Sequence, residues 1–386
     1  MQLHISKYHM YVTLLSSFII FCACTKDDIL IEEPPSATLE DYPAEMRAFL
    51  ASFSSFHRAW QDQTAIYEAW PLGQLWYDPS NEKVCQVYNA REKHEDLHHG
   101  NVLFRNKNER GEWSDPIVVA LWNSDNSSKR CHGAGVCPNG DYIALVLHED
   151  RDKSYGNVYV YRSQDKGVEW FNEGPILIDG KTIYVSESTC LFKTSTNRLL
   201  SYASVGLGHS QACVIYSDDN GVSWKKTMMP NGMGFMECTF VEMDNHDIYC
   251  IARQQDYYCY PNSPQMAHSE DNGSTWVYDG DTGICSTDAP VSQIKVGNNI
   301  YLLYGERWPY QRGKLTLRFN WLSTEEYHNM QFRKREIVLS EINSEVPDFS
   351  YPALVETPNT IQGTFYCRDG KWVSIFEMIA NKPIYN

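Results

Sequence analysis

Six stretches of the chain share one pattern, in which two apolar runs flank a short polar turn. Apolar runs around a tight turn predict antiparallel β-hairpins. Successive turns lie roughly 50 to 60 residues apart, a spacing typical of a structural repeat. The pattern therefore predicts an all-β chain built from six similar sheets. The six predicted turns are Asp78–Asn81, Pro138–Asp141, Thr194–Asn197, Asp244–Asp247, Val296–Asn299 and Glu356–Asn359.

A second repeat lies inside the first. The string Ser-x-Asp-x-Gly-x-x-Trp occurs at Ser163–Trp170, Ser217–Trp224 and Ser269–Trp276, with starts 54 and then 52 residues apart. An Asp side chain can bond backbone amides two residues on, and Gly tolerates a positive φ, so each copy predicts a tight turn. A pitch near 50 residues suits one four-stranded propeller blade. Together the two repeats predict a six-bladed β-propeller.

The motif resembles the Asp-box, or BNR repeat, of sialidases and their relatives. A degenerate fourth copy ends at Trp113. We expect residues 64–70 to supply the outer strand of the last blade, because closure by the N-terminal segment removes exposed sheet edges.

The up-and-down path of a blade assigns two faces. The turns between strands one and two and between strands three and four share one face, here called the bottom, which therefore carries the repeated motif. The starts of first strands and the ends of second strands lie on the opposite, top face. We therefore expect the chemistry of the protein on the top face, around the central channel.

Residues able to do chemistry fall at these top-face positions. Glu237 opens the first strand of blade four and Arg253 closes its second strand, so we expect the two to face each other across one hairpin. Other candidates in comparable places are Tyr351 in blade six, Arg91 and Asp96 in blade one, and Arg312 in blade five, with Arg307 and Arg318 as alternatives to Arg312. Glu187, at the start of blade three, is a further candidate for lining the pocket.

These segments resemble those of the sialidase superfamily (glycoside hydrolase family 33) from about residue 60 onward. Glu237 to Phe240 and Ile251 to Arg253 are similar to the glutamate strand and the second substrate arginine. Arg312-Gly313-Lys314-Leu315 resembles the segment of the third arginine, and Tyr351-Pro352 the nucleophile segment. Arg91 and Asp96 resemble a substrate-side arginine and the aspartate acid/base.

The resemblance implies an exo-acting retaining glycosidase that removes a terminal sialic acid or a related 2-keto acidic sugar, without a cofactor or a metal. A carboxylate on the anomeric carbon of such a sugar repels a carboxylate nucleophile, so a tyrosine deprotonated by a glutamate attacks instead. Arginines suit the sugar's carboxylate, because a guanidinium binds it bidentately and keeps its charge.

One departure from the family pattern keeps other functions open. Sialidases usually carry their first substrate arginine in a Tyr-Arg-Ile-Pro-like strand at the start of blade one. The corresponding stretch here, Tyr67 to Leu72, has no arginine, and Arg58 lies too early in the chain. The alternatives are a BNR-fold glycosidase or lyase acting on a different glycan, and a non-catalytic propeller that binds glycans.

The N-terminus predicts export. An apolar run from Tyr11 to Cys22 follows basic residues, as in a signal peptide, and Phe21-Cys22-Ala23-Cys24 resembles a lipobox with Cys24 as the lipidated residue. We expect residues 1–23 to be the signal peptide, 24–53 a lipidated tether and 54–386 the propeller. We expect the protein at the outer membrane, on the cell surface rather than in the periplasm. The lipid is expected to be its only contact with the membrane.

Charge and cysteine content narrow the range of possible ligands and metal sites. The net charge of -16 disfavours nucleic acid or an anionic membrane surface as a partner, so an anionic ligand must be bound by local arginines. The clustered His94, His98 and His99 and the twelve cysteines have no zinc-finger spacing. We expect most cysteines to be small core residues at strand positions, such as Cys190, Cys213, Cys238 and Cys250.

Overall fold

The computed structural model describes most of the chain from Tyr42 onward. The described residues are 42–60, 68–70, 74–91, 100–122, 127–149, 156–185, 190–205, 211–231, 233, 237–254, 263–284, 289–307, 314–332, 334–343, 349–369 and 372–383. The expected signal peptide and the lipidation site at Cys24 therefore lie outside the described residues.

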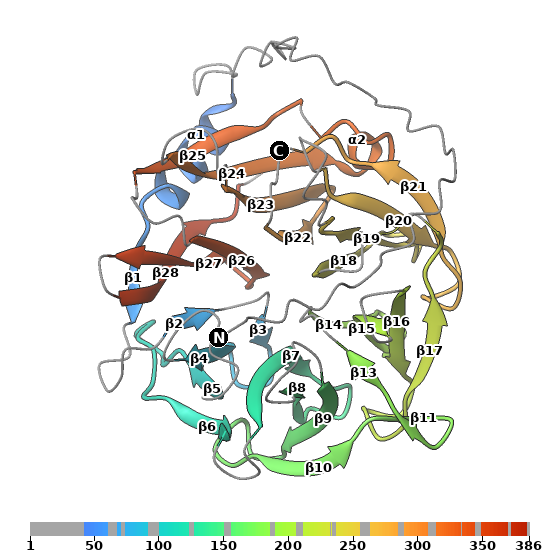
Figure 1. The fold of residues 1–386 in the computed structure, drawn as a ribbon. Helices are drawn as coiled ribbons and strands as arrows, with labels where there is room; N and C mark the ends of the chain where they lie inside the picture. Colours follow the sequence, from blue (N-terminus) through green and yellow to red (C-terminus); the bar gives the residue numbers. More distant parts are fainter. Residues whose placement is uncertain are drawn as a thin grey trace, which may run out of the picture. The chain divides into compact units, whose positions relative to one another are not determined.

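The sheets succeed one another around a ring as a six-bladed β-propeller, and each blade is an antiparallel sheet (Figure 1). All six predicted turns join the first and second strands of a blade, which confirms the predicted register. Blades two and three are hydrogen-bonded into one larger sheet, because Val185 pairs with Gly156 of blade two and with Val205 of blade three.

The strands of blades one to three, from the channel outward, follow chain order. Blade one has β2 (Glu68–Trp70) and β3 (Leu75–Asp78) on one edge, then β4 (Lys83–Arg91), β5 (Asn101–Asn106) and β6 (Ile117–Ala120). Blade two has β7 (Ser128–Val136), β8 (Tyr142–Glu149), β9 (Gly156–Ser163) and β10 (Phe171–Pro175). Blade three has β13 (Tyr184–Val185) and β14 (Leu191–Lys193), then β15 (Leu199–Val205), β16 (Gln211–Ser217) and β17 (Lys225–Met228). A small hairpin of β11 (Leu177–Ile178) and β12 (Lys181–Thr182) joins blades two and three.

Blades four to six complete the ring. Blade four has β18 (Cys238–Glu242), β19 (Ile248–Ala252), β20 (Gln265–Ser269) and β21 (Val277–Asp281). Blade five has β22 (Val291–Val296), β23 (Asn299–Arg307), β24 (Lys314–Ser323) and β25 (Ile337–Asn343), with helix α2 (Thr324–His328) between the last two. Blade six has β26 (Phe349–Glu356), β27 (Thr360–Asp369), β28 (Trp372–Asn381) and, outermost, β1 (His57–Trp60).

The ring is closed by the N-terminal part of the chain, as predicted, but by a different segment. The outer strand of blade six is β1 (His57–Trp60), which pairs with β28, whereas residues 68–70 pair with β4 in blade one. The expectation for residues 64–70 was therefore wrong. Strand β2 continues the line of β3 along β4, so it belongs to the inner edge of the first blade.

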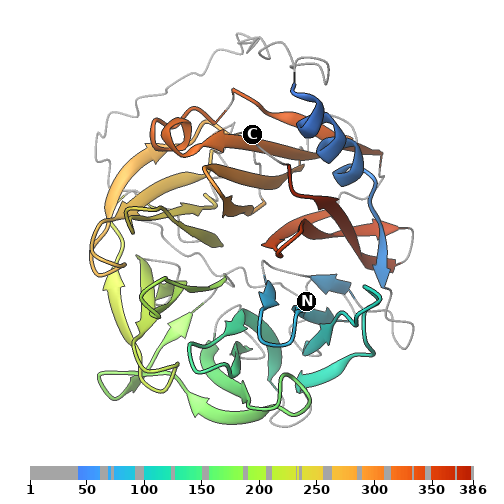
Figure 2. The same ribbon diagram turned by 180° about the vertical axis from the view of Figure 1, so that it is seen from behind.

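Helix α1 (Ala44–Phe53) was not predicted, and it lies in the segment 24–53 that was expected to be a tether. Met46, Phe49, Leu50 and Phe53 recur at helical spacing, and all four are buried. They join the core cluster between blades five and six. Figure 2 shows the helix, in blue, beside the strands of these two blades. Ordered packing therefore starts before residue 54.

The hydrophobic core is divided among the gaps between neighbouring blades. One cluster combines side chains of blades two and three, another those of three and four, and others fill the remaining gaps. The eight described cysteines are buried. Cys190, Cys213, Cys238 and Cys250 are core residues, as predicted.

The repeated motif forms the same turn three times. In each copy the Ser hydroxyl accepts the amide N–H of the Gly at 2.8 Å, while Asp side-chain oxygens accept the following amides. The residue before each Gly has a positive φ as well, so two successive left-handed residues make the turn. Lys166, Asn220 and Asn272 hold that position.

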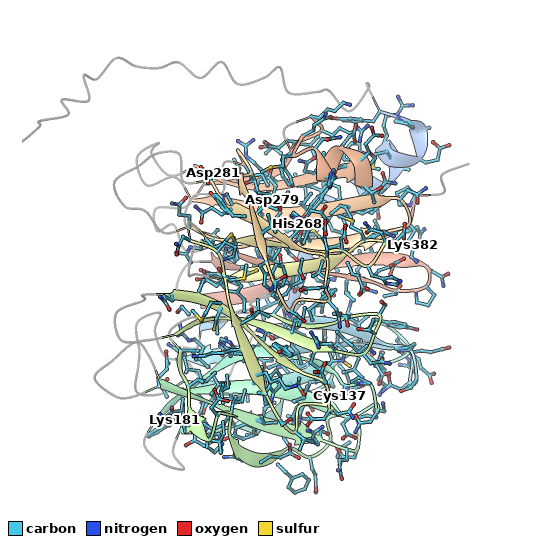
Figure 3. All side chains as sticks on the ribbon, turned by 90° about the vertical axis from the view of Figure 1, so that its right-hand side faces the viewer. Cys137, Lys181, His268, Asp279, Asp281 and Lys382 are labelled. Carbon is cyan, nitrogen blue, oxygen red and sulfur yellow. The ribbon has the colours of Figure 1, made fainter. Side chains whose placement is uncertain are left out.

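The two faces can be followed in a side view. Cys137 and Lys382 follow strands that run down to the bottom turns, whereas Lys181 and Asp281 lie where outer strands have returned to the top. Figure 3 shows the first pair on one side of the molecule and the second pair on the other. The up-and-down path therefore places the starts of β18 and β26 on the same face.

Candidate functional site

Three predicted residues meet on the top face. The hydroxyl of Tyr351 donates to Oε1 of Glu237 at 2.7 Å. Nη1 of Arg253 lies 3.1 and 2.9 Å from the two carboxylate oxygens of Glu237, and 3.2 Å from the Tyr351 hydroxyl. Residues from blades four and six, more than ninety positions apart, thus form one hydrogen-bonded cluster, here called the Tyr–Glu–Arg cluster.

Blade four positions two members of this cluster. The backbone N–H of Arg253 donates to the carbonyl oxygen of Glu237 at 2.8 Å, one step beyond the last register pair of β18 and β19. The two residues therefore face each other at the open end of the hairpin, as predicted. Both side chains are about 6% exposed, so their ion pair offsets part of the cost of removing each charge from water.

Tyr351 enters the cluster from a distorted start of β26. The register with β27 changes between Ser350 and Ala353, and both Ser350 (φ 125°) and Tyr351 (φ 48°) have a positive φ. Positive φ is uncommon for residues other than glycine. The ring of Tyr351 lies 5.7 Å from that of Tyr366. The bulge therefore directs Tyr351 differently from a regular strand residue.

Arg91 is in a second buried cluster, between blades one and two. Its Nη2 lies 2.5 Å from Oε2 of Glu149, and Nη2 of Arg130 lies 3.3 Å from Oε1 of the same carboxylate. Burial raises the pKa of Glu149, but Arg130 and Arg91 outweigh it and hold that pKa below its usual value. Arg91 is 3% exposed, and its hydrogen bond to Glu149 fixes its guanidinium.

Sequence reasoning missed Glu149 and Arg130. Glu149 ends the second strand of blade two, the position that Arg91 and Arg253 hold in their own blades. The same positional rule therefore predicts Glu149 as a top-face residue of blade two. Arg130 lies within the first strand of blade two, and only its contact with Glu149 distinguishes it from a surface arginine.

Other candidates lie elsewhere or outside the described residues. Arg318 binds Glu336 within blade five, and Arg58, on the outer strand of blade six, lies over the ring of Phe376. Asp96, Arg312, Glu187, His94, His98, His99 and the side chain of Arg307 lie outside the described residues. Within the described ranges, no group of His, Cys, Asp and Glu side chains could hold a metal ion.

A family match agrees with this architecture. Residues 86–367, more than half of the chain, match the family described as a BNR repeat-like domain. The chain belongs to the BNR repeat-like family. No curated protein sequence matches it.

Solved structures with the same fold support the BNR repeat-like assignment. A protein of unknown function from Dyadobacter fermentans has a TM-score of 0.68 and 16% identity, over 84% of this chain and 97% of its own. The Hadza microbial sialidase Hz136 has a TM-score of 0.63 and 13% identity, over 84% of this chain and 68% of its own. A mutant of the NanB sialidase from Streptococcus pneumoniae has a TM-score of 0.60 and 16% identity, over 84% of this chain and 70% of its own. At these identities the likeness shows a shared fold, so the chain is a sialidase-like BNR propeller.

Proposed function

We propose that the protein is an exo-acting retaining glycosidase of the sialidase type, which removes a terminal sialic acid or related 2-keto acidic sugar from glycans. The observation that carries the proposal is the 2.7 Å hydrogen bond from the Tyr351 hydroxyl to Glu237, with Arg253 beside both. A phenol hydrogen-bonded to a carboxylate is a nucleophile next to its base.

In this proposal Glu237 accepts the phenolic proton as the Tyr351 oxygen attacks the anomeric carbon. Asp96 protonates the leaving oxygen, and the sugar is then bound to Tyr351. Asp96 next takes a proton from water, the water oxygen displaces Tyr351, and the phenolic oxygen regains a proton from Glu237. Two displacements at the same carbon give retention of configuration.

The proposal assigns the sugar's carboxylate to Arg253, with Arg312 and Arg91 as further substrate-binding residues. A guanidinium suits this role because its charge survives at every working pH, and because two N–H groups can bind one carboxylate. Since the chain carries a net charge of -16, these local positive charges must offset the field of the whole molecule.

One observation favours an alternative, a BNR-fold glycosidase or lyase acting on a different glycan. Arg91 is bound to the buried Glu149, and the first strand of blade one, β2 and β3, carries no arginine. A site with fewer arginines on the substrate carboxylate would suit a different sugar. A non-catalytic glycan-binding propeller is the third candidate.

The deciding experiment measures release of a fluorescent aglycone from its sialic acid glycoside by the wild type and by Tyr351→Phe. We expect the substitution to lower kcat at least about 1,000-fold while sugar binding persists, because it removes the attacking oxygen and leaves the ring. Tyr278→Phe, on the outer strand β21, is the matched control and is expected to keep full activity.

Equal turnover by Tyr351→Phe and the wild type would contradict the proposed nucleophile. Release of the fluorescent aglycone from a neutral or uronic-acid glycoside, with none from the sialic acid glycoside, would favour the first alternative. Glycan binding with no turnover of any glycoside would favour the binding propeller.

We further propose that the protein is exported and anchored by a lipid on Cys24 at the outer membrane. The support is the apolar N-terminal run followed by the lipobox-like sequence. Neither helix among the described residues has the length and apolar character that a membrane crossing would need. Loss of metabolic fatty-acid labelling in Cys24→Ala would support the anchor, and unchanged labelling would contradict it.

A further inference from the structure

The ring of Tyr351 lies against that of a second tyrosine, Tyr366. The two ring centroids are 5.7 Å apart, and the ring planes meet at 34°. Aromatic side chains attract each other at such separations when their rings are offset or tilted. Tyr366 therefore packs against the ring of Tyr351, whereas Glu237 binds the oxygen at the end of that ring.

The contact with Glu237 fixes the position of the Tyr351 oxygen but not the plane of the ring. The phenolic oxygen lies on the axis about which the ring turns, so a rotation about that axis leaves its 2.7 Å distance to Glu237 unchanged. The torsion that sets this rotation, χ2, has broad minima in tyrosine, so the side chain alone holds the plane weakly. A neighbouring group must therefore hold the ring plane.

Tyr366 is a rigid neighbour. It is fully buried and lies in β27, the second strand of blade six. Strand β27 pairs with β28 along its whole length, without a register shift. Tyr351 instead lies in the bulge of β26, where the register with β27 passes from Ser350–Tyr366 to Ala353–Thr364. The regular strand therefore supports the ring that the irregular strand carries.

The ring plane matters because it influences the direction of attack. The lone pairs of a phenolic oxygen are oriented by the ring to which the oxygen is bonded. A displacement at carbon needs one of these lone pairs aligned with the bond that breaks, as well as a short distance. In the proposed mechanism, a turn of the Tyr351 ring would therefore slow the attack even while the oxygen stays at Glu237.

We propose that Tyr366 is a positioning residue, which holds the ring plane of Tyr351 and thereby aims its oxygen at the anomeric carbon. This inference rests on the proposed function, in which Tyr351 is the nucleophile. The ring of Tyr366 has this role, and its hydroxyl does not. Phenylalanine at position 366 should therefore preserve the role, and leucine should remove it.

The test compares Tyr366→Leu with Tyr366→Phe in cleavage of the fluorescent sialic acid glycoside. We expect Tyr366→Leu to lower kcat about 10-fold to 100-fold with KM changed less than about 3-fold, because a misaligned nucleophile mainly slows the chemical step. Tyr366→Phe keeps the aromatic pair and should keep kcat within about 3-fold of the wild type.

Tyr301→Leu is the matched control. Tyr301 is also fully buried in the second strand of a blade, β23 of blade five, and its ring contacts those of Phe49 and Phe319. Its replacement by leucine removes a buried aromatic ring away from the Tyr–Glu–Arg cluster. We expect this variant to lose stability and to keep the kcat of the wild type.

Crystal structures of the wild type and of both Tyr366 variants give a readout that needs no activity. We expect the same Tyr351 ring plane in the wild type and in Tyr366→Phe, and a turned ring or several orientations in Tyr366→Leu. An unchanged kcat or an unchanged ring plane in Tyr366→Leu would overturn the inference. A loss of kcat in Tyr366→Phe as large as in Tyr366→Leu would overturn it too, because the hydroxyl would then have the role. If the wild type cleaves no glycoside, the proposed function fails, and the ring plane alone decides the role of Tyr366.

Discussion

At the scale of single residues, one guanidinium nitrogen connects the whole Tyr–Glu–Arg cluster. Nη1 of Arg253 contacts both oxygens of Glu237 and the hydroxyl of Tyr351. Because Glu237 and Arg253 are almost completely buried, each depends on the other to offset the cost of removing a charge from water. In the proposed mechanism the glutamate is the base for Tyr351, and in the structure it is a counter-charge for Arg253, so one substitution should disturb both.

The substitution Glu237→Gln separates charge from shape. We expect turnover of the sialic acid glycoside to fall at least about 100-fold, because the amide cannot accept the phenolic proton. Stability should fall by on the order of 3 kcal/mol, because Arg253 loses its buried counter-charge. Glu242→Gln, at the other end of β18, should cost at most about 1 kcal/mol and leave kcat unchanged. Urea unfolding and kcat measure both effects, and full activity in Glu237→Gln would exclude it as the base.

At the scale of elements, the repeated turns bind neighbouring blades together. Nη2 of Arg162 in blade two donates to the Asn220 carbonyl in the turn of blade three, and Nη1 of Arg198 in blade three donates to the Asn272 carbonyl in that of blade four, both at 2.9 Å. The glycines of these turns combine a positive φ with close packing, since a β-carbon on Gly167 would lie 2.3 Å from the ring of Phe104. The motif therefore stabilises the packing between neighbouring blades as well as the hairpins.

Two glycine substitutions distinguish these two effects. Gly111→Ala meets open space at a φ of 78°, so it should cost only the backbone strain, about 1 kcal/mol. Gly167→Ala adds the clash with Phe104 and should cost roughly 2 to 4 kcal/mol. Chemical denaturation of both variants measures the difference. Equal losses of stability would mean that the packing of Phe104 against the turn contributes nothing.

At the level of the whole molecule, one buried carboxylate links separate parts of the chain where the ring closes. Glu377 of blade six binds His57 of the N-terminal strand at 2.9 Å, Lys107 of blade one at 2.6 Å, and Nε1 of Trp113 at 3.1 Å. Burial lowers the pKa of Lys107, although Glu377 opposes that effect. Three parts of the chain therefore meet at the closure, here called the closure network.

A double-mutant cycle tests the closure network. Lys107→Met and Glu377→Met should each destabilise the protein by about 3 to 5 kcal/mol, because each leaves a buried charge without its main partner. The double variant should be more stable than either single variant, because two apolar side chains of similar size leave no charge to compensate. Additive losses in the double variant would show that the two charges do not interact across the closure.

The local structure and the number of blades follow from patterns within the sequence. The turns, the pitch of the motif and the alternation of apolar runs depend on neighbouring residues, so six blades, their register and two faces could be predicted. The same register predicts that Glu237 and Arg253 face each other across one hairpin. Helix α1 was not predicted, because its apolar stripe is short and lies in a segment that resembles a linker.

Contacts between side chains far apart in the sequence depend on how the blades pack. The contact of Tyr351 with Glu237 depends on how blades four and six lie around the channel, and no spacing along the chain records it. The pairing of Arg91 with Glu149, the strand that closes the ring, and the strained bulge at Ser350 depend equally on packing between blades. Local sequence patterns determine hydrogen bonds between residues that are close in the sequence. The candidate site forms where different blades meet, and the packing of the core between the blades determines how they meet.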